Sequence, residues 1–193
     1  IFRPKQIRKE CEQMPLPIER LYTTEDIYSL PEGERAELVD GQIYYMAPPG
    51  RKHQEIIAKF TQIISNYIDS KNGDCKVYPA PFAVFLNADN KTYVEPDISV
   101  VCDRNKLDDY GCNGAPDWVI EIVSPSSVSM DYSTKHFKYC TAKVREYWIV
   151  DYAKNIINVY NFETGQMKQY GFSDAIVSSI FPDLIIDFSQ LDI

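Results

Sequence analysis

The chain has 193 residues, a formal net charge of −8 and an isoelectric point of about 4.8. Hydrophobic residues make up 45% of it, which is enough for the core of one domain, and no apolar run is long enough to span a membrane. The acidic balance excludes a protein that coats nucleic acid through charge alone, but it allows an enzyme that meets nucleic acid through a metal ion or a local basic patch.

The N-terminal part of the chain predicts an arm followed by a helix and a hairpin. Residues 1–21 mix charges with prolines and predict a loosely attached arm, and residues 22–193 are predicted to fold as a single domain. Thr23-Thr24-Glu25-Asp26 is a helix-capping pattern and predicts a short helix. Asp40-Gly41 is a strong signal for a two-residue turn, so residues 37–46 are predicted to form a hairpin.

The rest of the chain alternates between helical and extended patterns. Apolar side chains recur at helical spacing over residues 53–67, and Pro79 and Pro81 indicate an edge or a bulge in the strand predicted over 75–86. The further predicted elements are strands over 96–101, 117–123 and 146–150, a helix over 131–141, a hairpin that begins at 155, and an apolar tail after Ser173 that packs back onto the domain. This order predicts an α/β fold with a central mixed β-sheet flanked by helices.

The cysteines give a prediction about redox state. Cys11, Cys75, Cys102, Cys112 and Cys140 are odd in number and contain no CxxC pair. We therefore expect reduced thiols in a cytoplasmic protein rather than a disulfide framework. With two histidines in the chain and scattered cysteines, a zinc site is not expected.

Glu121 is the residue that most strongly indicates chemistry. In a strand over 117–123, Trp118, Ile120 and Ile122 share one face, and Glu121 lies with two valines on the other. Both faces are apolar, as in a central strand that is covered on each side. A buried carboxylate costs several kcal/mol unless a cation or strong donors replace its water. Glu121 is therefore a candidate functional residue, and the alternative is a structural acid paired with a buried lysine or arginine.

Three further residues extend the candidate site. Asp97 opens an apolar strand and Glu37 opens the predicted hairpin, and two acids on neighbouring strands can share one Mg²⁺ ion. Lys135, on the helix after the Glu121 strand, could orient water or stabilise a phosphate oxygen. For Glu37 the alternative is an ordinary solvated acid. Lys135 could instead be the i,i+4 partner of Asp131 on an exposed helix face.

Two other side chains are weaker candidates. Lys138 is the nearest competitor of Lys135. His53 is expected in the first turn of its helix, facing solvent or the mouth of the site, and it titrates near neutral pH.

These residues carry a resemblance to a known family. Proline-aspartate, a glutamate strand and then a lysine resemble the PD-(D/E)XK nuclease superfamily, and more narrowly the Uma family of restriction-endonuclease-like proteins. The matching segments run from about Tyr22 to the C-terminus and include ELVDG at 37–41, EPDISVV at 95–101, PDWVIEIVSPS at 116–126, Asp131 with Lys135 and Tyr139, and EYWIVD at 146–151.

The resemblance implies a restriction-endonuclease-like core and Mg²⁺-dependent (or Mn²⁺-dependent) hydrolysis of DNA phosphodiester bonds. Carried over by position, Asp97 and Glu121 are the metal ligands and Glu37 is the third acid. The superfamily pattern places lysine two residues after the acid, where this chain has Val123. The lysine of the pattern is then Lys135, on the following helix.

Three classes of function remain open at this point. The first is a metal-dependent endonuclease that acts on DNA and is expected as a homodimer, whose two sites could serve the two strands of a duplex. The second is a catalytically inactive nuclease-like module that binds nucleic acid or a protein partner, which the net charge of −8 favours. Metal binding at Asp97 and Glu121 distinguishes these two classes. A glycosidase with two carboxylates is the third class and is disfavoured, because the proline-aspartate strand fits a metal better.

Overall fold

The computed structural model describes residues 20–87, 89–125 and 127–191, so the predicted N-terminal arm lies outside it except for Arg20 and Leu21. A six-stranded sheet forms the centre, in the order β11-β10-β9-β8-β5-β3. Its strands are β3 (Lys76–Pro79), β5 (Ile98–Val101), β8 (Trp118–Ile122), β9 (Glu146–Asp151), β10 (Ile156–Asn161) and β11 (Gln166–Gly171). β8 and β9 run parallel, and the other neighbouring pairs are antiparallel. The sheet is mixed, as predicted.

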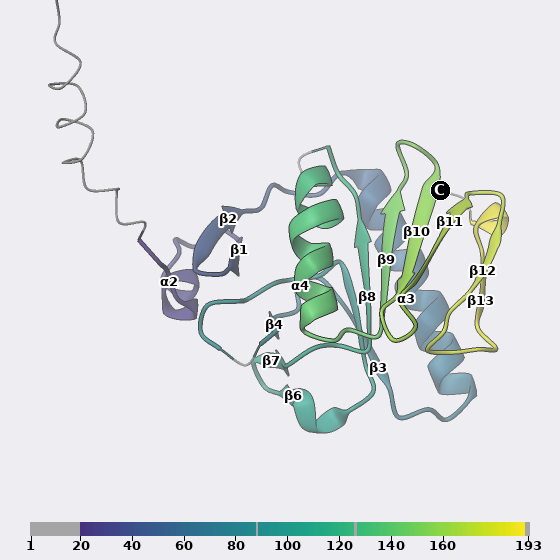
Figure 1. Ribbon diagram of the computed structural model, residues 1–193, viewed down its shortest axis with the longest axis horizontal. Coiled ribbons are helices and arrows are strands. Elements are labelled where there is room, and N and C mark those ends of the chain that lie inside the picture. The colour runs from purple at the N-terminus through teal and green to yellow at the C-terminus, as the bar shows by residue number, and fades with distance from the viewer. Residues whose placement is uncertain (1–19, 88, 126, 192–193) are drawn as a thin grey trace, which may run out of the picture.

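Helices cover both faces of this sheet (Figure 1). α3 (Arg51–Ser70) lies on one face, where its isoleucines and Phe60 pack with Trp118 and Trp148. On the other face lies a helix made of a π-helical segment, η2 (Met130–Lys135), followed by α4 (His136–Thr141). There Tyr139 packs with Val119 and other residues of the sheet. The alternation predicted for the Glu121 strand is confirmed. Trp118, Ile120 and Ile122 pack in the core on the α3 side, and Val119 and Val123 pack in the core on the α4 side.

A small hairpin stands apart from the sheet. β1 (Ala36–Val39) and β2 (Gln42–Tyr45) form a two-stranded sheet beside α2 (Thr24–Tyr28), and Figure 1 shows all three outside the central layers. Asp40 and Gly41 both have positive φ, at 51° and 78°, which is the conformation that a two-residue hairpin turn requires. The predicted helix and hairpin are both confirmed. A backbone bridge between Leu38 and Tyr93 attaches the hairpin to the rest of the domain.

The predicted strand over 75–86 is wrong as a single element. β3 ends at Pro79, and β4 (Val84–Phe85) joins a separate three-stranded sheet. The physical reason is the Pro79-Ala80-Pro81 sequence, because neither proline has an N–H with which to continue a ladder. The remaining short elements are η1 (Arg104–Lys106), β6 (Leu107–Asp108), β7 (Gly111–Asn113), β12 (Ala175–Val177), β13 (Ile185–Asp187) and η3 (Phe188–Gln190). The tail packs back as predicted, with Ile176 and Phe188 in the core on the α3 side.

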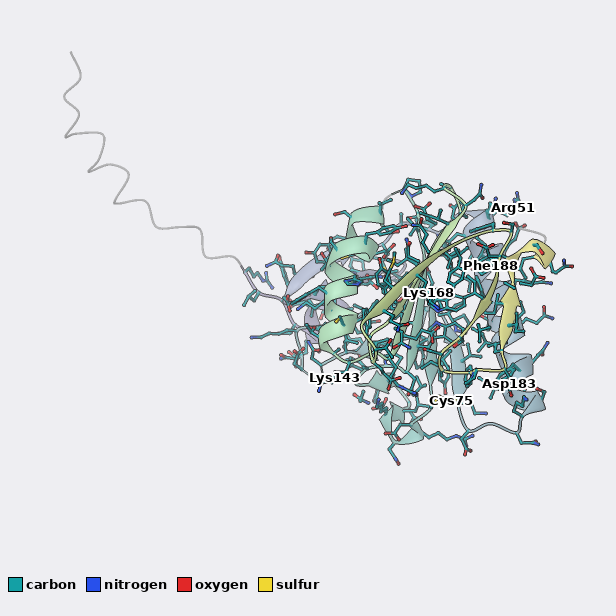
Figure 2. The ribbon with its side chains drawn as sticks, turned by 45° about the vertical axis from the view of Figure 1, so that its right-hand side comes forward. Arg51, Cys75, Lys143, Lys168, Asp183 and Phe188 are labelled. Carbon is teal, nitrogen blue, oxygen red and sulfur yellow. A yellow bond between two sulfur atoms is a disulfide. The ribbon has the colours of Figure 1, made fainter. Side chains whose placement is uncertain are left out.

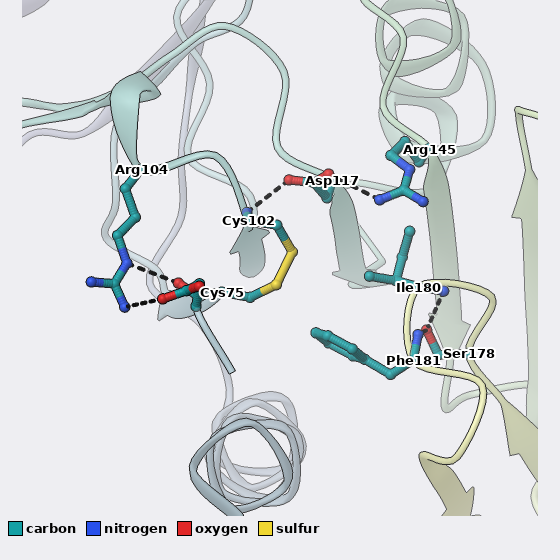
Figure 3. The surroundings of a disulfide bond; sticks show 9 residues. Cys75, Cys102, Arg104, Asp117, Arg145, Ser178, Ile180 and Phe181 are labelled. Carbon is teal, nitrogen blue, oxygen red and sulfur yellow. Dashed lines mark hydrogen bonds and ion pairs between the residues drawn. A yellow bond between two sulfur atoms is a disulfide. The ribbon is translucent and has the colours of Figure 1, made fainter. Parts of the chain in front are cut away.

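The prediction of five reduced cysteines was wrong for two of them. Cys75 and Cys102 form a disulfide with their Cα atoms 3.9 Å apart (Figure 3). They extend the antiparallel β3–β5 pair by one position beyond the Lys76–Val101 partners, which places them opposite one another. Cys112 and Cys140 are free, and Cys11 lies outside the described residues. Cys75 and the start of α3 at Arg51 lie at opposite ends of the domain (Figure 2).

Within the described ranges, no helix is long and apolar enough to cross a membrane.

Candidate functional site

Asp97 and Glu121 lie side by side on neighbouring strands. Ile98 and Ile120 are partners in the antiparallel β5–β8 pair, so Asp97 and Glu121 occupy the next position of the register. The Asp97 N–H donates to Glu121 Oε2 at 3.3 Å, and the Ile122 N–H donates to Asp97 Oδ2 at 2.7 Å. The central position of β8 buries the Glu121 side chain, whereas Asp97 precedes its strand and is partly open.

Lys135 joins this pair to Glu37. Its ammonium Nζ lies 2.9 Å from Glu121 Oε1 and 2.9 Å from Glu37 Oε1, and all three side chains are buried. Glu37 reaches the site from β1, where its Oε1 also accepts the Glu95 N–H at 2.9 Å. The structure therefore brings together all four residues that the sequence singled out. The alternative of an exposed Lys135 is wrong, and so is that of a solvated Glu37.

Asp131 and Tyr139 are members of the cluster that reasoning from residue patterns did not assign to it. Asp131 Oδ1 is 3.9 Å from Lys135 Nζ, and the Tyr139 hydroxyl donates to Glu121 Oε1 at 2.7 Å. Both side chains are buried. Asp131, Lys135 and Tyr139 follow one another at intervals of four, which aligns them on one side of a helix. That spacing was the signal that could have identified them, because it places Asp131 and Tyr139 on the same side of the helix as Lys135.

Of the two weaker candidates, His53 contacts the carboxylate cluster and Lys138 does not. His53 lies in the first turn of α3, where it is buried, and its Nε2 is 3.2 Å from Asp97 Oδ2. It lines the cavity described below, which is the second of its two expected positions. Lys138 points away from the cluster and pairs with Asp40 of the hairpin turn, so it does not compete with Lys135.

Burial and mutual repulsion shape the protonation of the site. Burial raises the pKa of Glu121 well above its usual value, Lys135 opposes this, and the charges of Asp131, Asp97 and Glu37 add to the rise. Burial likewise raises the pKa of Asp131 to about 6. For Lys135, burial favours the neutral form, but the carboxylates outweigh it and hold the pKa well above the usual value. The site thus contains more negative charge than its one lysine can neutralise.

A cavity of about 650 Å³ opens onto these side chains. Five carboxylates line it (Glu37, Glu95, Asp97, Glu121 and Asp131), against the two permanent cations Arg35 and Lys135. Counted formally, with every carboxylate ionised and His53 neutral, these groups sum to −3, and the raised pKa of Glu121 means that a proton or a cation offsets part of this charge. The hairpin and the linker after it contribute residues 43–50 to the wall. The other lining residues are Gln54, Ala80, Ile122, Ser124, Pro125, Ser127, Met130 and Tyr152.

The donor set fits a hard divalent cation. Mg²⁺ and Mn²⁺ prefer carboxylate oxygen, and an excess of buried negative charge is what such an ion offsets. Asp97 and Glu121 are the two carboxylates on adjacent strands that would hold it, with Glu37 beside them. Among the described residues, however, no three His, Cys, Asp or Glu side chains are arranged to hold a metal ion together. The Lys135 ammonium lies between two of the glutamates, so binding an ion requires side chains to turn.

Comparison with known proteins assigns the family. Residues 23–189 match the profile of Uma2, described as "Putative restriction endonuclease". The chain belongs to the Uma2 family. Its membership supports a nuclease as the class of function, and the resemblance read from the sequence is confirmed.

Two relatives illustrate the similarity of this Uma2 chain to other proteins. It is 27% identical over 129 residues to the "Uncharacterized protein slr1290" of Synechocystis sp. (strain ATCC 27184 / PCC 6803 / Kazusa), a match that covers 66% of this chain and 66% of that protein. A crystal structure of "a putative nuclease belonging to DUF820" from Anabaena variabilis ATCC 29413 has a TM-score of 0.72 and 18% identity. It covers 88% of this chain and 96% of its own, and it shows that the two share a fold.

Proposed function

We propose that this Uma2 protein is an endonuclease that hydrolyses DNA phosphodiester bonds with the help of Mg²⁺ or Mn²⁺. The observation that carries the proposal is the buried carboxylate cluster around Lys135, which opens into a cavity lined by five carboxylates and only two permanent cations. A polyanionic substrate cannot approach such a cavity unless cations accompany it. Family membership independently supports nuclease chemistry.

Each residue has a role in this proposal. A bound divalent ion supplies Lewis-acid polarisation of the phosphate and lowers the pKa of water. Asp97 and Glu121 would hold the ion through their carboxylates, and Glu37 would support it from the hairpin. Lys135 places a positive charge beside the attacked phosphate, where it stabilises the negative charge that grows on the phosphate oxygens. Tyr139 keeps Glu121 in its orientation through the 2.7 Å hydrogen bond.

The test compares DNA cleavage and Mn²⁺ binding in the native protein, in Glu121→Gln and in Glu163→Gln. Glu163 is an exposed acid paired with Arg145, remote from the cluster in sequence and not part of the cavity wall. We expect cleavage by the native protein and by Glu163→Gln, and its loss in Glu121→Gln and after chelation. Calorimetry should show Mn²⁺ binding that Glu121→Gln weakens by about 10-fold or more. Cleavage that survives both chelation and Glu121→Gln would contradict the proposal.

A second candidate function is a nuclease-like module that binds nucleic acid or a protein partner without cleaving. The position of Lys135 between Glu37 and Glu121 favours it, because the ammonium already neutralises part of the cluster. Absence of both cleavage and Mn²⁺ binding in the experiment above would select this function.

The homodimer and the cytoplasmic location also stay predictions. Sedimentation of the intact chain tests the first, because a dimer has twice the mass of the 22.3 kDa chain.

A further inference from the structure

We infer that the substrate is an unpaired strand of DNA, and that a base of this strand stacks on Tyr44 at the cavity wall. The inference rests on the proposed function, since it specifies which form of DNA reaches the carboxylate cluster. Three features of the described residues carry it: the depth of the cluster, the register of the hairpin and the charge of the cavity.

The cluster is recessed. The side chains of Glu121, Glu37 and Lys135 are only 4%, 5% and 7% exposed, and Asp97 reaches 15%. A phosphate must therefore enter the cavity before it meets them. At about 650 Å³ the cavity has the size of a small-ligand pocket, so it accepts a short piece of one strand. A duplex is far wider and has a persistence length of about 50 nm, so bending its backbone into such a pocket costs several kcal/mol. An unpaired strand bends freely.

The hairpin places an aromatic ring beside the acids. Tyr44 is the antiparallel partner of Glu37, so the two side chains lie on the same face of the β1–β2 pair. Tyr44 lines the cavity and is 40% exposed, so part of its ring is open to a ligand at the cavity wall. Glu37 turns inward to Lys135, and the ring of Tyr44 stands at the wall next to it. A strand whose phosphate reaches the cluster therefore carries its neighbouring base past this ring.

The charge of the cavity favours stacking over electrostatic binding. Proteins that hold duplex DNA neutralise many phosphates with lysine and arginine. Here the wall offers five carboxylates and the permanent cations Arg35 and Lys135, of which Arg35 is paired with Glu95. Binding must then come from the divalent ion and from contacts that do not depend on charge. Stacking of bases on aromatic rings is such a contact, and it is the one that single-strand-binding proteins use.

The test measures binding and cleavage of one labelled oligonucleotide, either alone or annealed to its complement. Binding is followed by fluorescence anisotropy with Ca²⁺ present, and cleavage with Mn²⁺. The variants are Tyr44→Ala, Tyr44→Phe and, as a matched control, Tyr110→Ala, which removes an exposed tyrosine that is not part of the cavity wall. Circular dichroism melting confirms that each variant is folded.

We expect the single strand to bind and to be cleaved at least 10-fold better than the duplex. Tyr44→Ala should weaken single-strand binding by about 5-fold or more, Tyr44→Phe should restore it because the ring remains, and Tyr110→Ala should have no effect. Equal or better use of the duplex overturns the inference, and so does a Tyr44→Ala variant that binds like Tyr110→Ala. If no DNA is cleaved, the proposed function is contradicted. The anisotropy measurement with Ca²⁺ does not depend on cleavage, so it still decides whether Tyr44 binds an unpaired strand.

Discussion

At the scale of single residues, Lys135 holds the candidate site together. Removing one partner of a buried ion pair leaves the other charge uncompensated, and Lys135 has two such partners in Glu37 and Glu121. We therefore expect Lys135→Met to lower the free energy of unfolding by about 3–5 kcal/mol at neutral pH. Urea denaturation measures the change.

The matched control is Lys138→Met, three residues further along the same helix. Its partner Asp40 is largely exposed, so the pair contributes about 1 kcal/mol or less. If the two variants lost the same stability, Lys135 would not be holding the charged cluster together.

Asp131 gives the site a pH dependence. Its pKa is raised from 3.8 to about 6 by burial, so the folded state binds the proton more tightly than the unfolded state does. The resulting stabilisation is full below pH ~4 and is lost as the pH rises through about 6, a change on the order of 2–3 kcal/mol. Asp131→Asn cannot titrate. We expect the stability of the native chain relative to this variant to fall over that interval, as measured by urea denaturation at a series of pH values.

The sequence allowed part of the site to be predicted, and the reason differs from residue to residue. Glu121 could be predicted because it is an acid in a strand whose two faces are otherwise apolar. Asp97 followed from its place at the start of the preceding apolar strand. The contact of His53 with Asp97 depends on how α3 docks on the sheet, and no local pattern encodes that docking. For Tyr139 the four-residue spacing from Asp131 and Lys135 marks an inward helix side, but its pairing with Glu121 also depends on docking.

At the scale of elements, the hairpin turn controls where Glu37 lies. Gly41 has φ of 78°, and a Cβ placed there would approach the Leu21 side chain to 3.1 Å. We expect Gly41→Ala to cost about 1–2 kcal/mol of stability and to weaken Mn²⁺ binding, because the distorted turn displaces Glu37. Thermal melting and calorimetry measure the two effects.

Gly33→Ala is the control for the hairpin. Gly33 has a similar φ of 89°, but a Cβ there meets no atom within 4 Å. This variant should show the backbone penalty and leave Mn²⁺ binding intact. Loss of Mn²⁺ binding in both variants to the same degree would mean that the turn does not position Glu37.

The elements themselves were mostly predictable from periodicity and turn chemistry. The α3 helix, the Asp40-Gly41 turn and the β10–β11 hairpin have strong local signals. The strand that was predicted over 75–86 failed because two prolines interrupt its ladder, although their meaning as an edge signal was correct for β3. The π-helical form of η2 could not be predicted, because six residues are too few to show a periodic pattern in the sequence.

At the scale of the whole molecule, the Cys75–Cys102 disulfide should affect stability without affecting the site. It joins positions 27 apart, for which loop closure alone predicts a stabilisation of about 3–4 kcal/mol. The bond lies at the end of β5 away from Asp97. We expect Cys75→Ser with Cys102→Ser to lower the free energy of unfolding and to leave Mn²⁺ binding unchanged.

Cys140→Ser is the control for this pair, because Cys140 is exposed and free. It should change neither quantity. If the double variant is as stable as the native chain, the two thiols do not form a stabilising bond in solution.

The mixed sheet was predictable as a class, and its strand order was not. The order of elements indicated α/β packing, but the pairing of β8 with both β5 and β9 arises from contacts between distant segments. The disulfide was missed for the same reason. Its two cysteines look scattered along the chain, and they meet only because β3 and β5 are antiparallel neighbours.

The separate hairpin has a consequence for how such proteins diversify. Asp97 and Glu121 belong to the central sheet, whereas Glu37 and Tyr44 belong to a two-stranded unit that is joined to α3 through Pro48-Pro49-Gly50. Insertions in the linker can reshape the cavity wall without disturbing β5 and β8, which position the proposed metal ligands. On the proposed function, a chimaera that keeps Glu37 but carries another protein's residues 43–50 should inherit that protein's choice of substrate.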